Sequence, residues 1–175
     1  MTLYVTRHGQ TEWNSEERVC GTSDIKLTDK GVTQAAELAM KLGDYKIDMV
    51  LSSPLNRART TAEILAKQWG GEVVLDSRLS EQNYGIYEGV SRSDEGFKYA
   101  KKQFPGKMLG GESVFRVVQR VYNLLDDINN GHHSNVLIVA HGSVCRVIHS
   151  YFNDLSNEEY SAYYIRNCEL KEYHF

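Results

Sequence analysis

The chain has 175 residues, of which 41% are apolar and 25% are charged, and its formal net charge at pH 7 is -3. At this length one domain is expected, and the apolar content suffices for a full core without a disulfide or a structural metal. The slightly acidic balance excludes a protein that binds nucleic acid through bulk positive charge, but it is compatible with a local basic pocket.

The number and spacing of the cysteines and the hydropathy of the sequence indicate the cellular compartment of the protein. Cys20, Cys145 and Cys168 form no CxxC pair, and their odd number argues against a disulfide framework. No basic stretch followed by a long apolar run opens the sequence, and no apolar run reaches membrane-spanning length. We therefore expect a cytoplasmic protein with reduced thiols and no membrane partner.

Strand-like and helical patterns alternate along the first half of the sequence. The β-prone run LYV (3–5) precedes the segment LTDKGVTQAAELAMKLGDY, which predicts a helix with Thr28 as N-cap and Gly43 as its stop. DMVLSS (48–53) is strand-like, LNRARTTAEILAKQWGG has helical spacing up to Gly70–Gly71, and EVVLD (72–76) is a third strand candidate.

The second half continues the alternation after a less periodic stretch at 78–111, where one short helix is expected near Asp94–Gln103. ESVFRVVQRVYNLLDDINN is a strongly amphipathic helix, NVLIVA (135–140) has the continuous apolar run of a strand buried on both faces, and SVCRVIHSYF returns to helical spacing. YYIRNCELKEYHF is left open as a last strand or a hairpin.

This order of elements predicts an α/β fold. We expect three layers, α/β/α, with a mostly parallel central sheet and helices on both faces. The sequence shows no repeat, no low-complexity segment and no linker, so residues 1–175 form one expected domain. An irregular segment at about 82–111 is expected to cover one part of it.

Three unusual groups follow three predicted strands. Arg7 and His8 follow LYVT, Arg57 follows DMVLSSP at the start of a helix, and His141 follows NVLIVA. Because ligands of open α/β sheets bind beyond the carboxyl ends of the strands, these side chains are expected to line one crevice. A helix beginning at Gly142 would add backbone N–H donors suited to an anion.

A crevice with two arginines and two histidines suits phosphoryl transfer. Arginine forks match phosphate oxygens, and a neutral imidazole such as that of His8 can attack phosphorus and form a covalent intermediate. The leaving alkoxide then needs a proton, which Glu81 in RLSEQNYG could supply from another strand–loop junction.

Each residue also has an ordinary interpretation. His8 alone would more often be structural, His141 would cap its helix, and Arg57 and Glu81 would be solvated. Those four interpretations must hold independently, whereas one crevice accounts for all of the residues.

The motifs in this order resemble those of the histidine phosphatase superfamily, also called the phosphoglycerate mutase-like superfamily. LYVTRHGQTEWN is similar to its RHGxT....N signature, GTSDIKLTDKG to its G..D..LT..G segment, VLSSPLNRARTTAE to its SxLxRAxxTA helix start, and LSEQNYGIYEG to its L.E..yG..EG loop. GGES with its following RV forms a fifth motif, and VLIVAHG is the sixth. The likeness extends from Leu3 to about Gly142, and six motifs in order are far more specific than RHG alone.

The resemblance implies a phosphoglycerate mutase-like fold and specific roles for the matching residues. His8 corresponds to the phosphorylated nucleophile, and Glu81 lies where members that dephosphorylate small molecules keep their acid. The phosphate-binding positions that it implies are Arg7, Asn14, Gly21, Thr22, Arg57, His141 and Gly142. Catalysis in the family needs no metal, no cofactor is expected for this chain, and the pair His132–His133 is interpreted as a solvated loop.

The sequence departs from the family pattern at positions that matter for mutase activity. Cys20 stands where many members have Gln or Thr, Gln82 where glycolytic mutases have an arginine, and Ser143 where those mutases have asparagine. Their long insertion with an arginine pair is also missing, and the cations between Asp94 and Glu112 are lysines only. These departures remove contacts to a substrate carboxylate and leave the phosphoryl chemistry in place.

A phosphatase acting on small phosphomonoesters is therefore the first hypothesis. The alternatives are a bisphosphoglycerate-dependent phosphoglycerate mutase, a catalytically silent binding module for phospho-ligands or proteins, and a phosphatase of phosphoproteins. No nucleic-acid partner is expected, and the sequence is silent on oligomeric state. Candidate substrates include sugar phosphates, phosphoglycerates, nucleotide precursors and α-ribazole phosphate, and the side chains that could select among them are Tyr84, Tyr87, Arg92, Phe97, Tyr99 and Phe104.

Overall fold

The computed structural model describes residues 1–175 and contains a five-stranded sheet in the order β3-β2-β4-β1-β5. The strands are β1 (Thr2–Arg7), β2 (Met49–Ser52), β3 (Val73–Leu75), β4 (Asn135–Ala140) and β5 (Leu170–His174). The first four run parallel, and only β5 is antiparallel to its neighbour β1. The predicted mostly parallel sheet is confirmed, and the C-terminal residues form a single edge strand.

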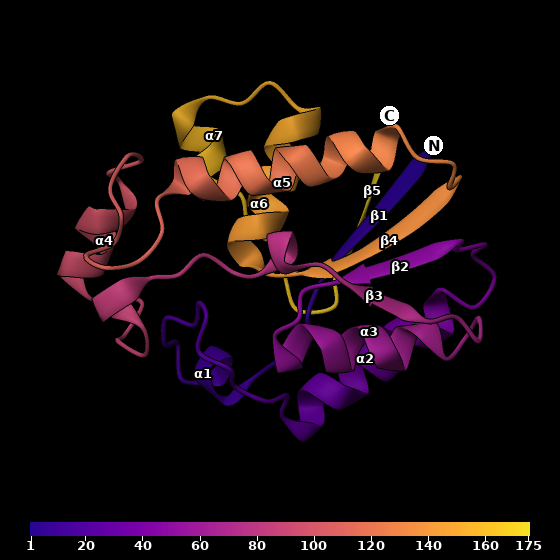
Figure 1. Cartoon of the computed structure of the whole chain (residues 1–175). Coiled ribbons are helices and arrows are strands. Elements are labelled where there is room, and N and C mark those ends of the chain that lie inside the picture. Colours follow the sequence, from indigo (N-terminus) through magenta and orange to yellow (C-terminus); the bar gives the residue numbers. More distant parts are fainter.

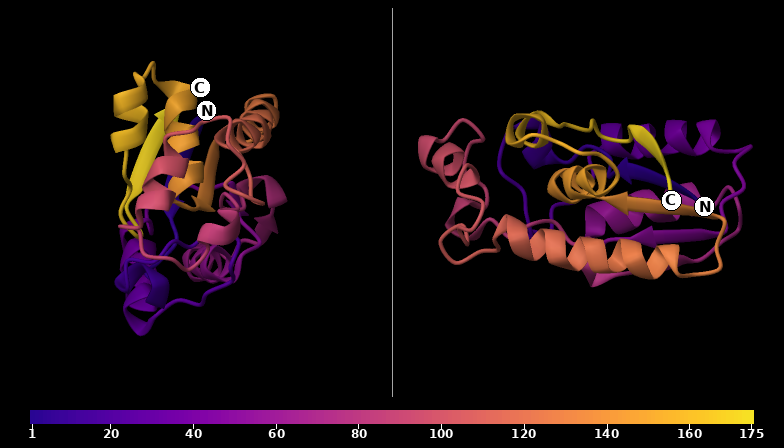
Figure 2. Two further views of the ribbon diagram at one scale, coloured as in Figure 1. Left: turned by 90° about the vertical axis from the view of Figure 1, so that its left-hand side faces the viewer. Right: turned by 90° about the horizontal axis from the view of Figure 1, so that it is seen from above.

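Helices cover both faces of this sheet. They are α1 (Glu12–Ser15), α2 (Asp29–Lys41), α3 (Asn56–Ala66), α4 (Glu95–Lys101), α5 (Val114–Asn129), α6 (Gly142–Phe152) and α7 (Asn157–Ala162). Helices α2 and α3 pack on one face and α5 and α6 on the other, as predicted for three α/β/α layers (Figures 1 and 2). Every helix is either too short or too polar to traverse a lipid bilayer.

The burial pattern explains why these segments form these elements. Val136 to Ala140 of β4 are all fully buried, because apolar side chains cover both faces of the central strand. One apolar cluster of 18 buried residues lies on the α5–α6 side, and a second of 10 buried residues lies on the α2–α3 side. Helix α2 begins as predicted, with the Thr28 hydroxyl accepting a hydrogen bond from the N–H of Gly31.

The structure differs from the sequence-based expectation at three helices. Helix α3 ends at Ala66 instead of continuing to Gly70–Gly71, and turns occupy the intervening residues. Helices α1 and α7 were not predicted. Both begin with a capping box, formed by Thr11 with Asn14 in α1 and by Ser156 with Glu159 in α7. This local signal was available in the sequence, but both helices are too short to show apolar periodicity.

The covering segment, residues 82–111, forms a small core together with Val19 from the loop after α1. Val19, Tyr84, Phe97 and Met108 are buried together, and the rings of Tyr84 and Phe97 meet edge to face with centroids 5.4 Å apart. Figure 1 shows that α4 lies beyond the carboxyl ends of the parallel strands, next to the beginning of α5. The covering segment is thus packed in a defined position above the end of the sheet.

Candidate active site

Strand register brings the two predicted histidines together. Arg7 at the end of β1 is paired with Ala140 at the end of β4, so His8 and His141 leave adjacent strands at the same level. Their ring centroids are 5.1 Å apart, and both side chains are buried. The crevice at the carboxyl ends of the strands, inferred from sequence positions more than 130 residues apart, is therefore present.

Gly9 completes the turn that holds His8. Its N–H donates to the Thr61 hydroxyl of α3 at 3.1 Å, and its Cα packs against the backbone of Gly31 in α2. A Cβ at position 9 would collide with the Gly31 carbonyl group. Close packing of this loop against two helices thus requires the glycine that follows His8.

Two hydrogen bonds define the tautomer of the His8 ring. The Gly9 carbonyl oxygen can only accept, so Nδ1–H donates to it at 2.7 Å. The Arg57 Nε–H then donates to Nε2 at 3.2 Å, which requires a lone pair on that nitrogen. Nε2 is the atom of His8 available for nucleophilic attack.

Electrostatics keep the His8 ring neutral. Burial, followed by the charges of Arg57 and Arg7, lowers the pKa of His8 well below its usual value of 6.5. The pKa of His141 is lowered in the same direction by burial and by the charge of Arg57. At neutral pH, His8 therefore carries the unprotonated nitrogen that attack on phosphorus needs.

His141 is held by a serine that the sequence analysis did not single out. Nε2 of His141 lies 2.8 Å from the hydroxyl of Ser53, and that hydroxyl also accepts the N–H of Leu55 at 3.2 Å. Nδ1 of His141 is buried and has no hydrogen-bond partner. Because buried polar atoms are nearly always paired, this nitrogen is a candidate contact for a bound ligand.

Arg7 shows the same incomplete pairing. Its Nη1 donates to the carbonyl of Ile165 at 3.1 Å and to the hydroxyl of Tyr164 at 3.2 Å, whereas its buried Nε has no partner. The residues that follow α7 thus orient this guanidinium, a contribution that the sequence analysis missed.

Arg57 is fully buried, and all its nitrogens donate hydrogen bonds. Besides the bond to His8, Nη1 donates to the Ser23 carbonyl at 2.8 Å and Nη2 to the Gly21 carbonyl at 2.6 Å. The guanidinium therefore connects His8 to the loop at residues 20–23.

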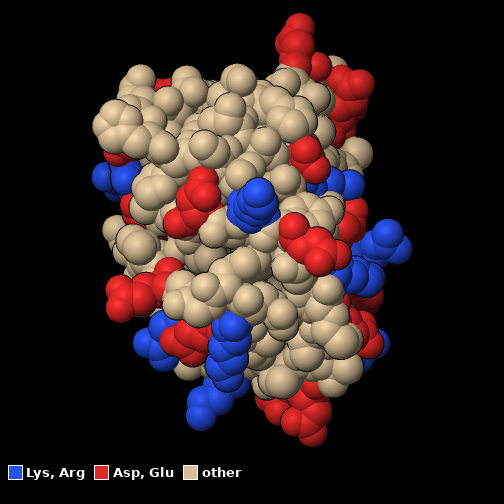
Figure 3. Space-filling model, turned by 90° about the vertical axis from the view of Figure 1, so that its right-hand side faces the viewer, with Lys and Arg blue, Asp and Glu red and all other residues tan.

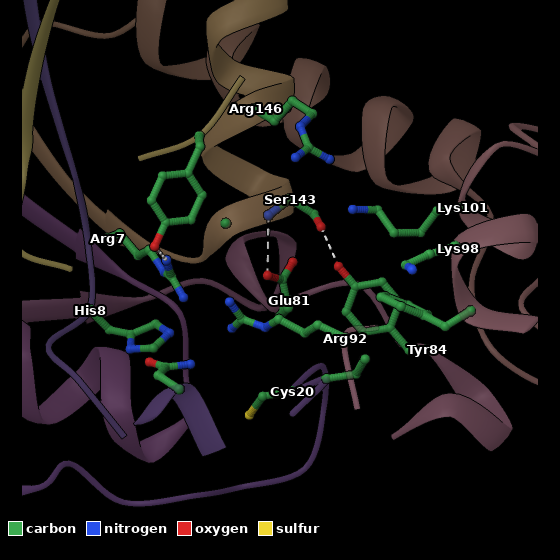
Figure 4. Close-up of a pocket in the computed structure, with 15 residues that line it drawn as sticks. Arg7, His8, Cys20, Glu81, Tyr84, Arg92, Lys98, Lys101, Ser143 and Arg146 are labelled. Atoms are coloured by element: carbon green, nitrogen blue, oxygen red, sulfur yellow. Dashed lines mark hydrogen bonds between the residues drawn. The ribbon is translucent and has the colours of Figure 1, made fainter. Parts of the chain in front are cut away.

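Glu81 lies at the N-terminus of α6. One carboxylate oxygen accepts the N–H of Ser143 at 3.1 Å, and the other accepts the N–H of Gln82 at 2.8 Å. His141, the N-cap residue of α6, makes no side-chain cap, so Glu81 supplies an acceptor to the first turn from a distant loop. These bonds fix the carboxyl group in the wall of the pocket (Figure 4).

The cavity at this site has a volume of about 200 Å³. Predicted residues in its lining are Arg7, His8, Asn14, Glu81, Tyr84, Arg92, Phe97 and Gly142. Asn14 is oriented through its Oδ1, which accepts the Thr11 N–H and the Asn167 Nδ2–H, both at 3.2 Å. Arg7, His8 and Glu81 therefore line one cavity. Arg57 and His141 do not line it but contact His8.

Some predicted residues lie elsewhere. The N–H groups of Gly21 and Thr22 both donate to the Glu88 carboxylate at 3.0 Å, and neither residue lines the cavity, whereas Cys20 does. Tyr99 and Phe104 line an adjacent cavity. Tyr87 packs against Phe97, with ring centroids 5.8 Å apart. Phosphate contacts from Gly21 or Thr22 have no support in this geometry, because Glu88 already binds their N–H groups.

The charge of the pocket corrects one part of the sequence analysis. The departures from the mutase pattern suggested a shortage of cations for a second anionic group. In the structure Arg92, Lys98 and Lys101 from the covering segment and Arg146 from α6 all line the cavity (Figure 4). The sequence analysis did not single out Arg146. This residue lies one turn after Ser143 on α6, and that position indicates a pocket residue only when the start of α6 is known to face the site.

Comparison with known proteins agrees with this geometry. The family model of the histidine phosphatase superfamily (branch 1) matches residues 3–175. The protein belongs to this superfamily. A curated relative, the probable phosphoglycerate mutase of Erwinia tasmaniensis, is 35% identical over 178 residues, covering 97% of this chain and 83% of the relative.

Solved structures with the same fold include enzymes named as phosphatases. The mycobacterial glucosyl-3-phosphoglycerate phosphatase superposes with a TM-score of 0.86 at 27% identity, covering 98% of this chain and 88% of the other. The α-ribazole phosphatase of Shigella flexneri gives a TM-score of 0.87 at 25% identity, with 98% and 89% of the two chains covered. The resemblance inferred from the six motifs is thus confirmed at the level of family and fold.

The neutral histidines of this superfamily site lead to a prediction for stability. Below about pH 6.5, His8 and His141 bind protons in the unfolded state but stay neutral in the fold. The unfolded state then holds more protons, so the free energy of unfolding must fall as the pH drops, by up to about 1.4 kcal/mol per pH unit for each histidine. Urea unfolding at pH 7.5, 6.0 and 5.0 measures this slope.

Matched histidine variants separate this contribution from that of the carboxylates. His141→Gln should reduce the slope between pH 6 and 5 by up to about 1.4 kcal/mol per unit, since one buried neutral histidine is removed. His132→Gln should leave the slope unchanged, because His132 is exposed. Equal slopes in the wild type and the His141 variant would show that His141 titrates normally in the fold.

Glu88 supports a second prediction. Its carboxylate accepts the backbone N–H groups of Gly21, Thr22, Ser23 and Tyr84. Glu88→Ala should lower the free energy of unfolding by about 2–4 kcal/mol, or roughly 5–15 °C in Tm, because these donors lose a charged acceptor. Thermal unfolding checks this, with Glu63→Ala on the exposed face of α3 as control. A shift no larger than that of the control would mean that water replaces the carboxylate at little cost.

Proposed function

We propose that the protein is a phosphatase that hydrolyses small phosphomonoesters through a phosphohistidine on His8, without a metal. The observation that supports this most directly is the pairing pattern around His8. Its Nε2 carries a lone pair, and beside it the buried Arg7 Nε and His141 Nδ1 lack hydrogen-bond partners. A phosphoryl group bound at this position would give the Arg7 Nε–H an oxygen acceptor, and it would do the same for His141 Nδ1 in the tautomer that has its proton on Nδ1.

The first chemical step is attack by His8 Nε2 on phosphorus. The bond from Nε2 to phosphorus forms while the bond from phosphorus to the alcohol oxygen breaks, and protonated Glu81 gives its proton to the departing oxygen. Charge on the equatorial oxygens is stabilised by Arg7 and Arg57, and the site relies on positioned cations for most of its effect.

The second step regenerates the enzyme. Glu81, now a carboxylate, takes a proton from a water molecule whose oxygen attacks the phosphohistidine. The bond between phosphorus and Nε2 breaks, inorganic phosphate leaves, and Nε2 recovers its lone pair. Glu81 ends the cycle protonated, so protons and electrons balance over the two steps.

A phosphoglycerate mutase is the second candidate, and two observations favour it. The curated relative is named a probable phosphoglycerate mutase, and the cations around the pocket could hold a second anionic group. A mutase must retain the phosphoryl group until it returns to the substrate, whereas Glu81 is placed at the pocket wall, where it can activate water. The phosphatase therefore remains the preferred function.

Phosphate release decides between the candidates. The wild type should release inorganic phosphate from several members of a panel of phosphomonoesters, with EDTA present throughout. Isomerisation of 3-phosphoglycerate in the presence of a trace of bisphosphoglycerate, with little phosphate release, would instead establish the mutase. Inactivity in both assays would favour the binding module.

A further inference from the structure

The pocket contains more positive charge than one phosphate group needs. Arg7 lines the cavity beside His8, and Arg57 donates to His8 from behind it. Four further cations line the cavity: Arg92, Lys98, Lys101 and Arg146. Lys98 and Lys101 lie one turn apart on α4, and Ser143 and Arg146 lie one turn apart on α6. Figure 4 shows the side chains of Lys101 and Arg146 extending toward each other near Ser143.

No carboxylate forms an ion pair with the inner members of this group, Lys101 and Arg146, although the charge of Glu81 in the lining partly offsets that of Lys101. Neither Lys101 nor Arg146 forms an ion pair, and the pair of Lys98 with Glu95 at 2.7 Å is exposed to solvent. Arg146 donates from Nε and Nη2 to the Tyr163 carbonyl, and its Nη1 makes no hydrogen bond. The Lys101 ammonium makes no hydrogen bond, and it lies 5.7 Å from the centroid of the Phe97 ring. Donors therefore remain available on both residues.

Bringing these charges together costs free energy in the absence of an anion. Lys101 is an exposed residue as a whole, but partial burial of its ammonium, followed by the charges of Arg146 and Arg92, lowers its pKa. On the opposite side of the molecule, basic and acidic side chains are interspersed (Figure 3). The uncompensated cations are thus a feature of the pocket, in a protein whose net charge is -3.

We propose that Lys101 and Arg146, with Lys98 beside them, form a second anion subsite, and that the substrate is a phosphomonoester carrying a second anionic group. A carboxylate or a second phosphate would satisfy the free donors equally well. The inference rests on the proposed function only for the position of the first phosphate at His8. Glu81, the acidic residue in the lining, is reserved for proton transfer and is bound to Ser143.

The subsite also borders space for a larger carbon skeleton. A second cavity, of about 420 Å³, shares Lys98, Lys101, Ser143 and Arg146 with the first. Its other walls include the side chains of Phe104, Met108 and Tyr160. An organic group attached to the second anion would therefore meet apolar and aromatic surface.

Ligand binding tests the subsite without depending on turnover. We would measure Kd by calorimetry in the His8→Ala protein for two matched pairs: 3-phosphoglycerate with glycerol 3-phosphate, and fructose 1,6-bisphosphate with fructose 6-phosphate. The first pair differs in a carboxylate and the second in a phosphate. Lys101→Gln and Arg146→Gln would be added singly, with Lys107→Gln, an exposed lysine outside both cavities, as control.

The subsite predicts selective losses. Lys101→Gln and Arg146→Gln should each weaken the doubly anionic member of at least one pair by about 10- to 100-fold, as expected for a charge-assisted hydrogen bond. The singly anionic partner should change less than about threefold, and Lys107→Gln should change neither. The pair that responds identifies the second anion as carboxylate or phosphate.

Other results would overturn the subsite. Equal weakening of both members of each pair would indicate only a general electrostatic field, and unchanged affinities or no binding of any ligand would also reject it. If Arg146→Gln fails to fold because its bonds to Tyr163 are lost, the exposed Lys101 decides alone. Phosphate release by the wild type is measured in a separate assay. Rejection of the anion subsite would therefore leave the proposed phosphatase activity untouched, and absence of phosphatase activity would leave the binding data interpretable.

Discussion

His8→Ala should lower kcat for every phosphomonoester substrate by at least about a thousandfold, the scale on which loss of a covalent nucleophile acts. Nε2 of His8 is held with a lone pair at the pocket, and two buried nitrogens of neighbouring residues, Arg7 Nε and His141 Nδ1, lack partners. Arg7 and Arg57 would still bind phosphate, so the variant should lose turnover while it retains affinity for the substrate. Steady-state kinetics with direct measurement of inorganic phosphate checks this.

The intermediate provides a second measurement. Wild-type protein quenched in alkali during turnover of a ³²P-labelled ester should carry label that is stable to base and lost in acid, as expected for a phosphorus–nitrogen bond. His8→Ala should carry none, and His132→Ala should behave as the wild type because His132 lies in an exposed turn. Normal turnover or labelling in the His8 variant would contradict the assignment of the nucleophile.

Glu81→Gln should reduce the rate of the first chemical step, transfer of the phosphoryl group to His8, in a manner that depends on the leaving group. For alkyl phosphates, whose alcohols need a proton, the expected loss is about 10²- to 10⁴-fold, the usual range for a general acid. For p-nitrophenyl phosphate, whose leaving group departs without a proton, the first step should change less than about tenfold. Single-turnover rates for a series of leaving groups measure this dependence.

The glutamine variant is suited to this experiment because it preserves most of the local structure. An amide oxygen can still accept the Ser143 N–H or the Gln82 N–H, so the start of α6 keeps an acceptor. Glu16→Gln, an exposed surface change, is the control. Equal losses for all leaving groups would show that Glu81 positions α6 and does not transfer the proton.

If both results are obtained, the outer cations become the main determinant of substrate choice. In the proposed mechanism, the chemical step uses groups at the ends of β1 and β4 and on α3, together with Glu81, which directly precedes the covering segment. Lys98, Lys101 and Arg92 come from the covering segment, which has a separate small core. Changes in this segment could alter the substrate without disturbing the phosphoryl site.

Local sequence was sufficient for the strands and the longer helices, and it brought four candidate site residues to one edge of the sheet. The apolar run of β4, the Thr28 cap of α2 and the amphipathic spacing of α5 each depend on short-range patterns that survive in the fold. Arg7, His8, Arg57 and His141 could be placed together because parallel strands share a carboxyl edge, so their positions followed from strand order.

The contacts that hold the site residues in place are formed only by tertiary packing. Glu88 binds the N–H groups of Gly21 and Thr22, Ser53 orients His141, and the residues after α7 hold Arg7. No local pattern encodes these contacts, because each joins segments that are distant in the sequence.

The cations of the pocket are the clearest case of an arrangement that local sequence patterns do not predict. In the sequence, Lys98 and Lys101 are ordinary lysines of a short helix, and Arg146 is one arginine within a largely buried helix. They share a pocket because the small apolar core of the covering segment holds α4 beside the start of α6, an arrangement that no periodicity predicts. Short-range patterns were thus enough to infer the fold, and the ordered motifs were enough to infer the family. The electrostatic field that the substrate meets depends instead on long-range packing of the covering segment.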